Sequence, residues 1–406
     1  MKTVLIVGAG AAGLMAAYSA ASEGKKVIVF EKNEKAGKKI YITGKGRCNL
    51  TNNCNATEYI KNVVRNPKFT YGAINAFSPS DVMNFFVSFG LKLKTERGKR
   101  VFPKSDKSSD VIKSLLKACT ENCVQIRYNS IVDDVIYSDN KIKGLTVDGE
   151  FIEGDSVIIC TGGISYPLTG STGDGYKFAI KAGHTVSDLK PALIGLNLAD
   201  NIHTKLQGLS LKNVSLTAYI SGKKVFSEMG ELLFTHFGLS GPIALSCSSL
   251  INRADEKTVS LFIDLKPALT EDTLNSRLIR EFETYNKKSV SNAMFTLEPK
   301  SLAIQILKIC NIDVNKHCCD ITAKERDEII KTLKRFELSY KGLRPIEEAI
   351  ITSGGVSPDE INPKTMESKI IKGLFFAGEV IDVDAYTGGF NLQTAFSTGY
   401  LAGKNA

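Results

Sequence analysis

The sequence predicts an α/β fold in which a parallel sheet carries a dinucleotide-binding turn and is interrupted by a large insertion. Residues 4–7 and 27–30 are short apolar runs on either side of the helix-forming segment 11–21, which predicts a β–α–β unit with parallel strands. Residues 214–220 alternate apolar and polar side chains, as half-buried antiparallel strands do. Residues 374–378 return to a buried strand that runs into a glycine turn.

The remaining elements divide the chain into four segments. Its 406 residues exceed the size of one hydrophobic core. Further predicted elements are a helix over 109–118, strands over 125–134, 143–147, 156–160 and 259–265, and a helix after the capping box of Thr322 and Glu325. The predicted segments are the first part of a nucleotide-binding domain at 1–190, an inserted β-rich domain at 191–268, an inserted helical subdomain at 269–343, and the C-terminal part of the nucleotide-binding domain at 344–406.

Composition narrows the class of protein. The chain is 43% hydrophobic and 23% charged, as in ordinary globular enzymes. Its net charge of +9 is spread along the chain and interleaved with acids, so we predict no nucleic-acid partner and a small-molecule substrate. No run approaches the roughly 18 apolar residues of a membrane span. The nine cysteines include no CxxC pair, and no group of Cys, His and acids has metal-ligand spacing, so we expect free thiols, a cytoplasmic protein and no metal. No oligomeric state is predicted.

The first glycine turn has the spacing of a dinucleotide fingerprint. Gly8, Gly10 and Gly13 follow a predicted strand and open a predicted helix, and Glu31 lies roughly 20 residues further on. Gly8 permits the tight turn, Gly10 lets a pyrophosphate approach the backbone, and Gly13 permits close helix–strand packing. The helix N-terminus then offers free N–H groups to the phosphates, and the carboxylate accepts hydrogen bonds from a ribose.

A second segment distinguishes FAD from NAD. Gly378 and Glu379 end a strand near the C-terminus, and Gly389 precedes a predicted helix that continues to about residue 401. A second helix N-terminus suits the far end of an extended dinucleotide, where its positive dipole stabilises an anionic reduced flavin. We therefore predict a Rossmann-type, two-dinucleotide-binding FAD domain that is split across both ends of the chain.

Several further blocks resemble one family. They are residues 44–52 (GKGRCNLTN), 100–103 (RVFP), 161–163 (TGG), 169–175 (TGSTGDG), 235–242 (THFGLSGP) and 354–399. In this order they resemble the BaiN/YhiN-like NAD(P)/FAD-dependent oxidoreductases. The resemblance implies noncovalent FAD, a FAD domain with an inserted β-rich domain and a helical subdomain, and reactions that include reduction of bile-acid C=C bonds and oxidation of aminoacetone.

The motifs and the resemblance together assign a set of residues to the cofactor. These residues occupy the two glycine turns, the acid after the second strand, the basic segment behind it and the strand ends that face the same edge. They are Gly8, Gly10, Ala11, Ala12, Gly13, Glu31, Lys32, Lys38, Gly46, Arg47, Cys48, Asn49, Val132, Thr161, Gly162, Gly378, Glu379, Gly389, Asn391, Leu392 and Gln393.

Four residues are candidates for handling substrate or a proton. Arg47 can orient an anionic or carbonyl group, His236 can donate a proton near neutral pH, and the hydroxyls of Tyr166 and Tyr386 can donate to a carbonyl. Each also has a plain structural alternative: a solvated basic loop for Arg47, a hydrogen-bonded loop for His236, and a pocket wall for the tyrosines. For Cys48, packing is the favoured role over redox chemistry.

The predicted function is an FAD-dependent oxidoreductase that reduces an activated C=C bond of a hydrophobic enone, of bile-acid or steroid type, with NAD(P)H. The sequence has no second dinucleotide fingerprint, so either NAD(P)H binds transiently over the flavin or the electrons come from a partner. Two alternatives stay open: an oxidase of a small amine such as aminoacetone, which releases hydrogen peroxide, and a non-catalytic flavin sensor.

Overall fold

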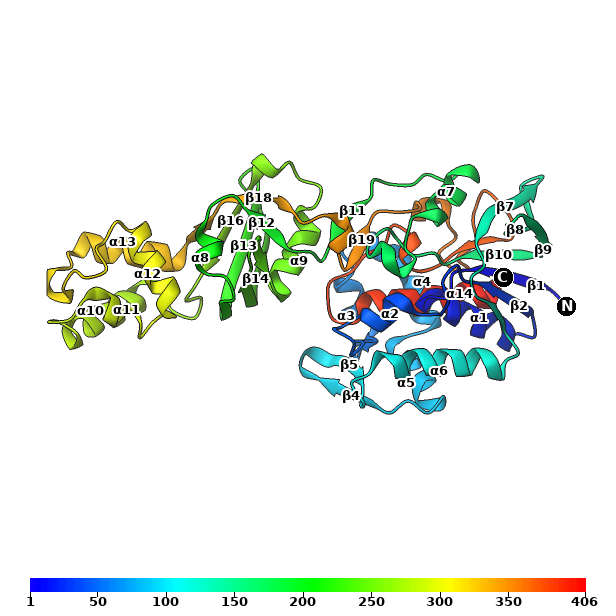
Figure 1. Ribbon diagram of the computed structural model, residues 1–406, viewed down its shortest axis with the longest axis horizontal. Helices are drawn as coiled ribbons and strands as arrows, with labels where there is room; N and C mark the ends of the chain where they lie inside the picture. The colour runs from blue at the N-terminus through cyan, green and yellow to red at the C-terminus, as the bar shows by residue number, and fades with distance from the viewer. The chain divides into compact units, whose positions relative to one another are not determined.

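The computed structural model describes residues 1–406, which form two compact units (Figure 1). One unit contains residues 1–192 and 345–406, and the other contains residues 193–344. The predicted fold class is confirmed: a parallel sheet with helices is built from both ends of the chain, and an antiparallel sheet with helices is inserted in the middle. No helix combines the length and the apolar character needed to cross a membrane.

The first unit is organised around a five-stranded parallel sheet. Its order is β20-β10-β1-β2-β6, with bounds Leu374–Phe376 (β20), Ser156–Ile159 (β10), Thr3–Val7 (β1), Lys26–Phe30 (β2) and Gln125–Arg127 (β6). The apolar side chains of the central strands are buried, as expected when both faces of a parallel sheet are covered. Because β20 pairs with β10 in register Val157–Leu374, the C-terminal segment completes a sheet that the N-terminal segment begins.

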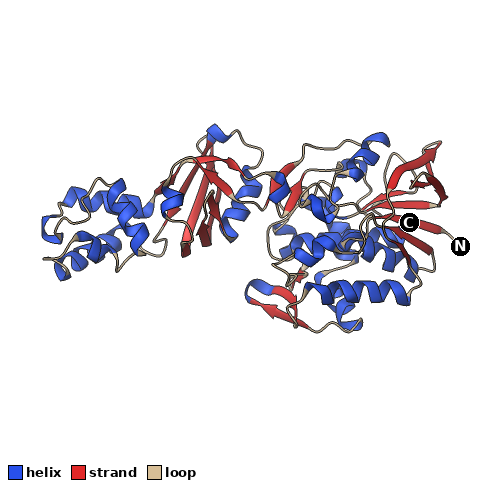
Figure 2. Cartoon of the chain, viewed as in Figure 1, coloured by secondary structure: helices blue, strands red, loops and turns tan.

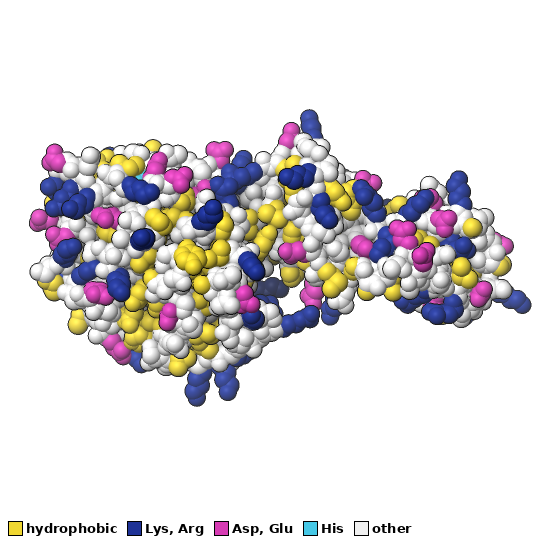
Figure 3. Space-filling view, turned by 180° about the vertical axis from the view of Figure 1, so that it is seen from behind, with side chains coloured by type: hydrophobic (Ala, Val, Ile, Leu, Met, Phe, Trp, Pro, Cys, Tyr) yellow, Lys and Arg dark blue, Asp and Glu magenta, His cyan; other side chains and the backbone are white.

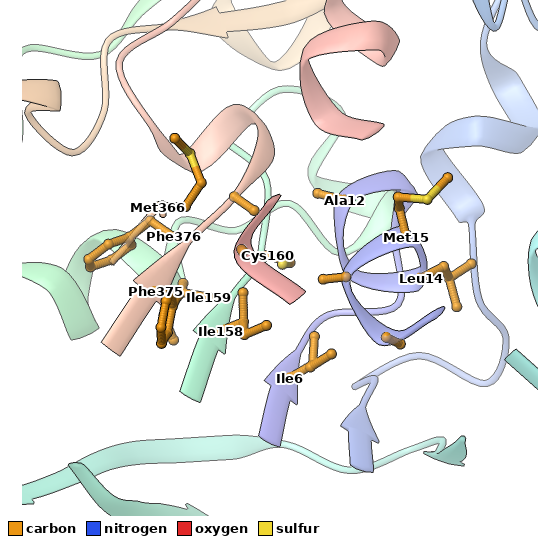
Figure 4. Packing of buried hydrophobic residues seen from close by; sticks show 14 of the residues in the cluster. Ile6, Ala12, Leu14, Met15, Ile158, Ile159, Cys160, Met366, Phe375 and Phe376 are labelled. Atoms are coloured by element: carbon orange, nitrogen blue, oxygen red, sulfur yellow. The ribbon is translucent and has the colours of Figure 1, made fainter. Parts of the chain in front are cut away.

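Two helices from opposite ends of the chain pack against each other beside this sheet. Helix α1 (Ala11–Ser22) follows β1, and α14 (Phe390–Asn405) is the last helix. Gly399 and Gly403, one helical turn apart, face the backbone of α1. A Cβ atom on Gly403 would lie 2.2 Å from the Ala16 carbonyl oxygen, so only glycine permits this approach. Figure 4 shows α1 beside the strands that carry Ile6 and Ile158, and Leu14 and Met15 of this helix belong to the same buried cluster.

Smaller elements surround the parallel sheet. The helices are α2 (Lys38–Ile42), α3 (Ala56–Lys61), α4 (Tyr71–Ala76), α5 (Pro79–Ser88), α6 (Ser108–Glu121) and α7 (Asp174–Lys181). The strands are β3 (Thr51–Asn52), β4 (Leu93–Glu96), β5 (Arg100–Pro103), β7 (Val132–Ser138), β8 (Lys141–Val147), β9 (Glu150–Glu153), β11 (Lys190–Ala192) and β19 (Ile351–Ser353). They form the sheets β3-β5-β4, β7-β8-β9 and β11-β19.

One predicted strand is two strands in the structure. The strand expected over 125–134 is divided between β6 and β7, with Asn129 in the left-handed region (φ 51°) between them. The two pieces serve different sheets, because β6 pairs with β2 and β7 pairs with β8. Apolar alternation alone does not reveal such a switch of partner.

The second unit combines a seven-stranded sheet with a group of helices (Figure 2). The sheet order is β17-β16-β13-β14-β15-β12-β18, with bounds Phe336–Leu338, Val259–Asp264, Ser210–Ile220, Lys223–Phe234, Gly238–Ser240, Leu196–Leu198 and Tyr340–Leu343. The helices are α8 (Ile202–Lys205), α9 (Pro242–Ile251), α10 (Glu271–Thr284), α11 (Val290–Met294), α12 (Lys300–Ile309) and α13 (Ala323–Lys334). The expected capping box of Thr322 and Glu325 starts α13. Buried residues of strands and helices form one hydrophobic cluster.

The contact between α1 and α14 generates a prediction about stability. In a Gly403→Ala variant the new methyl group would clash with the Ala16 carbonyl, so we expect a loss of about 1–3 kcal/mol in the free energy of unfolding. Denaturant unfolding of the purified protein measures this loss. Lys404→Ala on the exposed side of the same helix is the control and should change stability by less than about 0.5 kcal/mol. Equal stability of Gly403→Ala and the parent would refute the close packing.

Candidate active site

A large cavity opens where the strands of the parallel sheet end. Four segments that follow strand ends line it: Gly8 after β1, Glu31 after β2, Thr161 after β10 and Gly378 after β20. The carboxyl edge of such a sheet is where ligands of doubly wound folds bind.

The glycine turn after β1 has a shape that only glycine permits. Gly8 has φ +99°, and a Cβ atom there would lie 2.7 Å from the Cys160 carbonyl oxygen; a Cβ atom on Gly13 would lie 1.9 Å from the Gly8 carbonyl oxygen. Gly10 differs, because its Cβ position has no atom within 4 Å and Gly10 lines the cavity. No side chain caps α1, and its first turn holds no acid. Its N–H groups are therefore available to an anion.

The acid that follows β2 is fixed by backbone donors. Glu31 is 8% exposed and lines the cavity. Its Oε2 accepts a hydrogen bond from the Ala9 N–H at 2.9 Å, and its Oε1 accepts one from the Asn33 N–H at 2.9 Å. Oε1 also accepts from Asn33 Nδ2 at 2.6 Å, whereas Oε2 has one protein donor and retains accepting capacity, so a hydroxyl group of a bound sugar can still donate to Oε2.

A second helix N-terminus opens on the same cavity. Gly389 precedes α14 with φ +97°, no side chain caps the helix, and Asn391 and Leu392 of its first turn line the cavity. The Asn391 side chain accepts from the Ala385 N–H at 2.9 Å and donates to the Ala385 carbonyl at 2.7 Å, which fixes the preceding loop. Two uncapped helix ends at one cavity suit a ligand with negative charge or acceptor oxygens at two separate places.

Lys39 of α2 forms a charged network in the cavity wall. Its Nζ lies 2.7 Å from Glu379 Oε2 and 2.7 Å from Ser165 Oγ. Glu379 Oε1 also accepts from the Thr352 N–H at 2.8 Å. Lys39, Glu379 and Thr352 all line the cavity. The network ties together segments that are far apart in sequence and presents paired charges to the ligand.

Comparison with known proteins identifies the family. The family model described as the HI0933-like protein Rossmann domain matches residues 2–405. The chain belongs to the HI0933-like family. This confirms the resemblance to BaiN/YhiN-like proteins, and the chain is an FAD-dependent oxidoreductase.

Full-length relatives of this HI0933-like chain carry two kinds of name. It is 30% identical to a 3-dehydro-bile acid delta(4,6)-reductase of Clostridium scindens, over 100% of this chain and 99% of the relative. It is 31% identical to a ribosomal RNA dihydrouridine synthase of Haemophilus influenzae, over 98% of this chain and 96% of the relative. A 3-ketosteroid delta1-dehydrogenase from Sterolibacterium denitrificans has a similar fold, with a TM-score of 0.54 and 13% identity over 99% of both chains.

The cavity of this HI0933-like chain fits FAD. Its residues supply an anion-binding turn, an acid for a ribose and a second helix end, and the buried Thr161 Oγ1 in its wall has no hydrogen-bond partner within the protein. The predicted cofactor residues that line the cavity are Gly8, Gly10, Ala11, Ala12, Glu31, Lys32, Lys38, Val132, Thr161, Gly162, Gly378, Glu379, Asn391 and Leu392. FAD supplies the redox chemistry when it is bound.

Seven predicted cofactor residues do not line the cavity: Gly13, Gly46, Arg47, Cys48, Asn49, Gly389 and Gln393. Gln393 is fully buried and donates to the Phe77 carbonyl at 3.1 Å, while Thr51 Oγ1 donates to its side-chain oxygen at 2.5 Å. Cys48 is also fully buried, and burial raises the pKa of its thiol to about 12, so it is protonated and unreactive at neutral pH.

The four candidates for substrate or proton handling lie outside the cavity lining. Arg47 is paired with Glu96 at 2.5 Å and Asp106 at 2.6 Å, and these acids raise the pKa of its guanidinium. Tyr166 lies near the lining residue Thr169, and its carbonyl accepts from the Thr169 N–H.

The remaining two candidates are placed in different units. Tyr386 lies in the loop before α14, and its N–H donates to the Asn62 carbonyl at 2.9 Å. His236 belongs to the second unit, where its ring contacts that of Phe237. The catalytic roles of all four remain predictions.

Several lining residues had no sequence signal. Lys39 is one of two adjacent lysines, and nothing in its neighbourhood shows that it pairs with an acid 340 residues away. Ile351 and Thr352 come from the short strand β19, which lies just before the 354–399 block that resembles the family. Contacts between residues so far apart in sequence are visible only in the folded chain.

The open space at Gly10 generates a prediction about cofactor binding. A Gly10→Val side chain would extend into the cavity without touching the protein, so we expect a folded protein with at least tenfold less bound flavin. The visible flavin absorbance per protein chain measures the loss, and circular dichroism checks the fold. Ser22→Val at the exposed end of α1 is the matched control and should remain yellow. A fully yellow Gly10→Val protein would contradict this placement of the phosphates.

Proposed function

We propose that this flavoenzyme reduces a C=C bond that is conjugated to a carbonyl group, with NAD(P)H as electron donor. In this reaction the alkene carbons gain a hydride and a proton, and NAD(P)H becomes NAD(P)⁺. The observation that carries the proposal is that full-length relatives with different substrates have names that describe one type of reaction. A delta(4,6) bile acid with a 3-oxo group and a uracil ring both contain a C=C bond conjugated to a carbonyl.

The first substrate candidate is a hydrophobic enone of bile-acid or steroid type. The relative named as a bile-acid reductase supports it. Apolar side chains also contribute to the cavity wall, among them Ile350, Ile351, Val383 and Leu392. Ile350 is 39% exposed, and an exposed apolar side chain at a cavity favours contact with an apolar ligand.

The second substrate candidate is a uridine in RNA. Two relatives, from Escherichia coli and Haemophilus influenzae, are named ribosomal RNA dihydrouridine synthases and match 99% and 98% of this chain. Composition alone led us to expect no nucleic acid, and these relatives are the reason to propose RNA here.

Anaerobic stopped-flow spectroscopy tests the reaction. NADPH or NADH should bleach the visible flavin band, and a conjugated C=C substrate added afterwards should restore it. We expect restoration at least tenfold faster with a suitable substrate than with buffer alone, and a product that has gained two hydrogen atoms by mass spectrometry. One arm uses a 3-oxo-Δ4,6 steroid and the other an RNA hairpin with uridines in its loop.

The same experiment separates the alternatives. Restoration by neither substrate, with rapid restoration by oxygen and release of peroxide, would count against a reductase and in favour of an oxidase. A flavin that neither pyridine nucleotide reduces would show that NAD(P)H is not the donor. Saturated analogues of each substrate, which lack the conjugated bond, are the matched controls and should leave the flavin bleached.

A further inference from the structure

We infer that one face of the β4–β5 hairpin binds the sugar–phosphate backbone of RNA and leads a target uridine toward the flavin cavity. This inference rests on the proposed reduction of a uridine. The face is defined by the exposed residues Lys92, Arg97, Arg100, Lys104 and Lys107, which we call the basic hairpin face. All five belong to the unit that contains the cavity.

The hairpin has a larger excess of basic over acidic residues than the chain as a whole. Residues 92–107 contain seven Lys or Arg and two Asp or Glu. Lys94 pairs with Asp106 and Glu96, and Lys99 pairs with Glu58. The structure gives the five residues of the basic hairpin face no ion pair with an acid of the protein. Their charges are therefore not neutralised within the protein.

The strand pairing places three of these cations on one side of the hairpin. In the register of β4 and β5, Glu96 lies opposite Arg100, and the Lys104 N–H donates to the Lys92 carbonyl at 2.7 Å. Because side chains alternate along a strand, Lys92, Arg100 and Lys104 share one face with Glu96 and Phe102, while Val101 points to the other face. Like charges opposite each other destabilise a hairpin. A bound polyanion would therefore reduce the repulsion between Lys92 and Lys104.

Lys and Arg side chains project into solvent at this edge. In Figure 3 dark blue side chains extend from the lower edge of the unit, where Figure 1 places β4 and β5. The platform beneath them is rigid. The Arg47 guanidinium lies 4.3 Å from the centre of the Phe102 ring and is held by Glu96 and Asp106. When the backbone that carries the charged side chains is already ordered, binding of phosphates costs less conformational entropy.

A short path joins this face to the cavity. Helix α2 contributes Lys39 and Ile40 to the cavity wall, and the neighbouring Tyr41 is 56% exposed. Ser108, next to Lys107, donates through Oγ to the Tyr41 carbonyl at 2.7 Å. Tyr41 therefore presents a solvent-exposed aromatic ring one residue from the cavity lining, and such a ring is one on which an unpaired base can stack.

RNA is the occupant that this arrangement favours. Unpaired cations on a hairpin suit evenly spaced phosphates, which fix register without reading sequence. An enzyme that acts on a base must take it out of the stack and into a pocket, and an aromatic ring beside the pocket assists that step. A membrane surface would use the same charges without a need for the neighbouring cavity.

Binding of a fluorescein-labelled RNA hairpin with uridines in its loop tests the inference. Fluorescence anisotropy with the FAD-loaded protein, without NAD(P)H, gives affinity as a function of salt. We expect the triple variant Lys92→Gln, Arg97→Gln, Lys104→Gln to bind at least about tenfold more weakly at low salt, with a slope of log affinity against log salt smaller by about 2–3. The matched control is Lys26→Gln, Lys141→Gln, Lys143→Gln, which removes equal charge from exposed residues beside the amino ends of the strands.

The outcomes distinguish this surface from the proposed reaction. Equal loss in both triple variants, no salt-dependent binding by the parent, or hairpin-dependent binding of anionic lipid vesicles without binding of RNA would overturn the inference. Failure of the proposed reaction would appear separately, as no substrate-dependent flavin reoxidation in a protein that still binds RNA. Reduction of a free steroid enone by the hairpin variant should match the parent, because these side chains do not line the cavity.

Tyr41 provides an independent test of the path to the cavity. Tyr41→Ala should raise KM for the RNA substrate at least about fivefold, since loss of base stacking costs about 1–3 kcal/mol. Tyr41→Phe keeps the ring and should behave like the parent. Unchanged KM in Tyr41→Ala would place the target base elsewhere.

Discussion

The site depends on the close approach of two helices from opposite ends of the chain. Gly399 and Gly403 allow α14 to lie against the backbone of α1 at distances that any side chain would prevent. Because the helices are held side by side, both of their N-termini open on the same cavity. Gly378 continues this contact, since a Cβ atom there would lie 2.8 Å from the Cβ of Ala12. Small residues at one interface therefore bring two uncapped helix N-termini to one cavity.

The electrostatics of the cavity come mainly from backbone groups. Its lysines are all engaged: Lys32 pairs with Asp174, Lys38 with Glu34, and Lys39 with Glu379. The anion-binding capacity therefore rests on the uncapped N–H groups of the two helices. Two other helices of the same unit differ, because Asn55 caps α3 and Ser78 caps α5. Such a cap at α1 or α14 would occupy the N–H groups that the ligand needs.

The sequence predicted the parts of this site that depend on local contacts. The turn from Gly8 to Gly13 and the acid at Glu31 belong to a single β–α–β unit, whose geometry is determined by neighbours in the chain. The Lys39–Glu379 pair joins residues 340 positions apart, and no local pattern encodes it. The place of Arg47 in a glycine-rich motif predicted a role at the cofactor, but no local pattern indicated that its side chain pairs with Glu96 and Asp106. The net charge of the whole chain does not reveal that Lys and Arg are concentrated at residues 92–107.

The split construction has a consequence for how the enzyme is made. During synthesis α1 leaves the ribosome long before α14, and domains usually fold as they emerge. Strand β10 exposes an edge until β20 pairs with it, and the flavin cavity lacks one wall for the same period. A chain that stops within the inserted unit would contain the first glycine turn but would lack part of the flavin cavity. Retention of the yellow cofactor therefore reports that translation and folding have both reached the last helix.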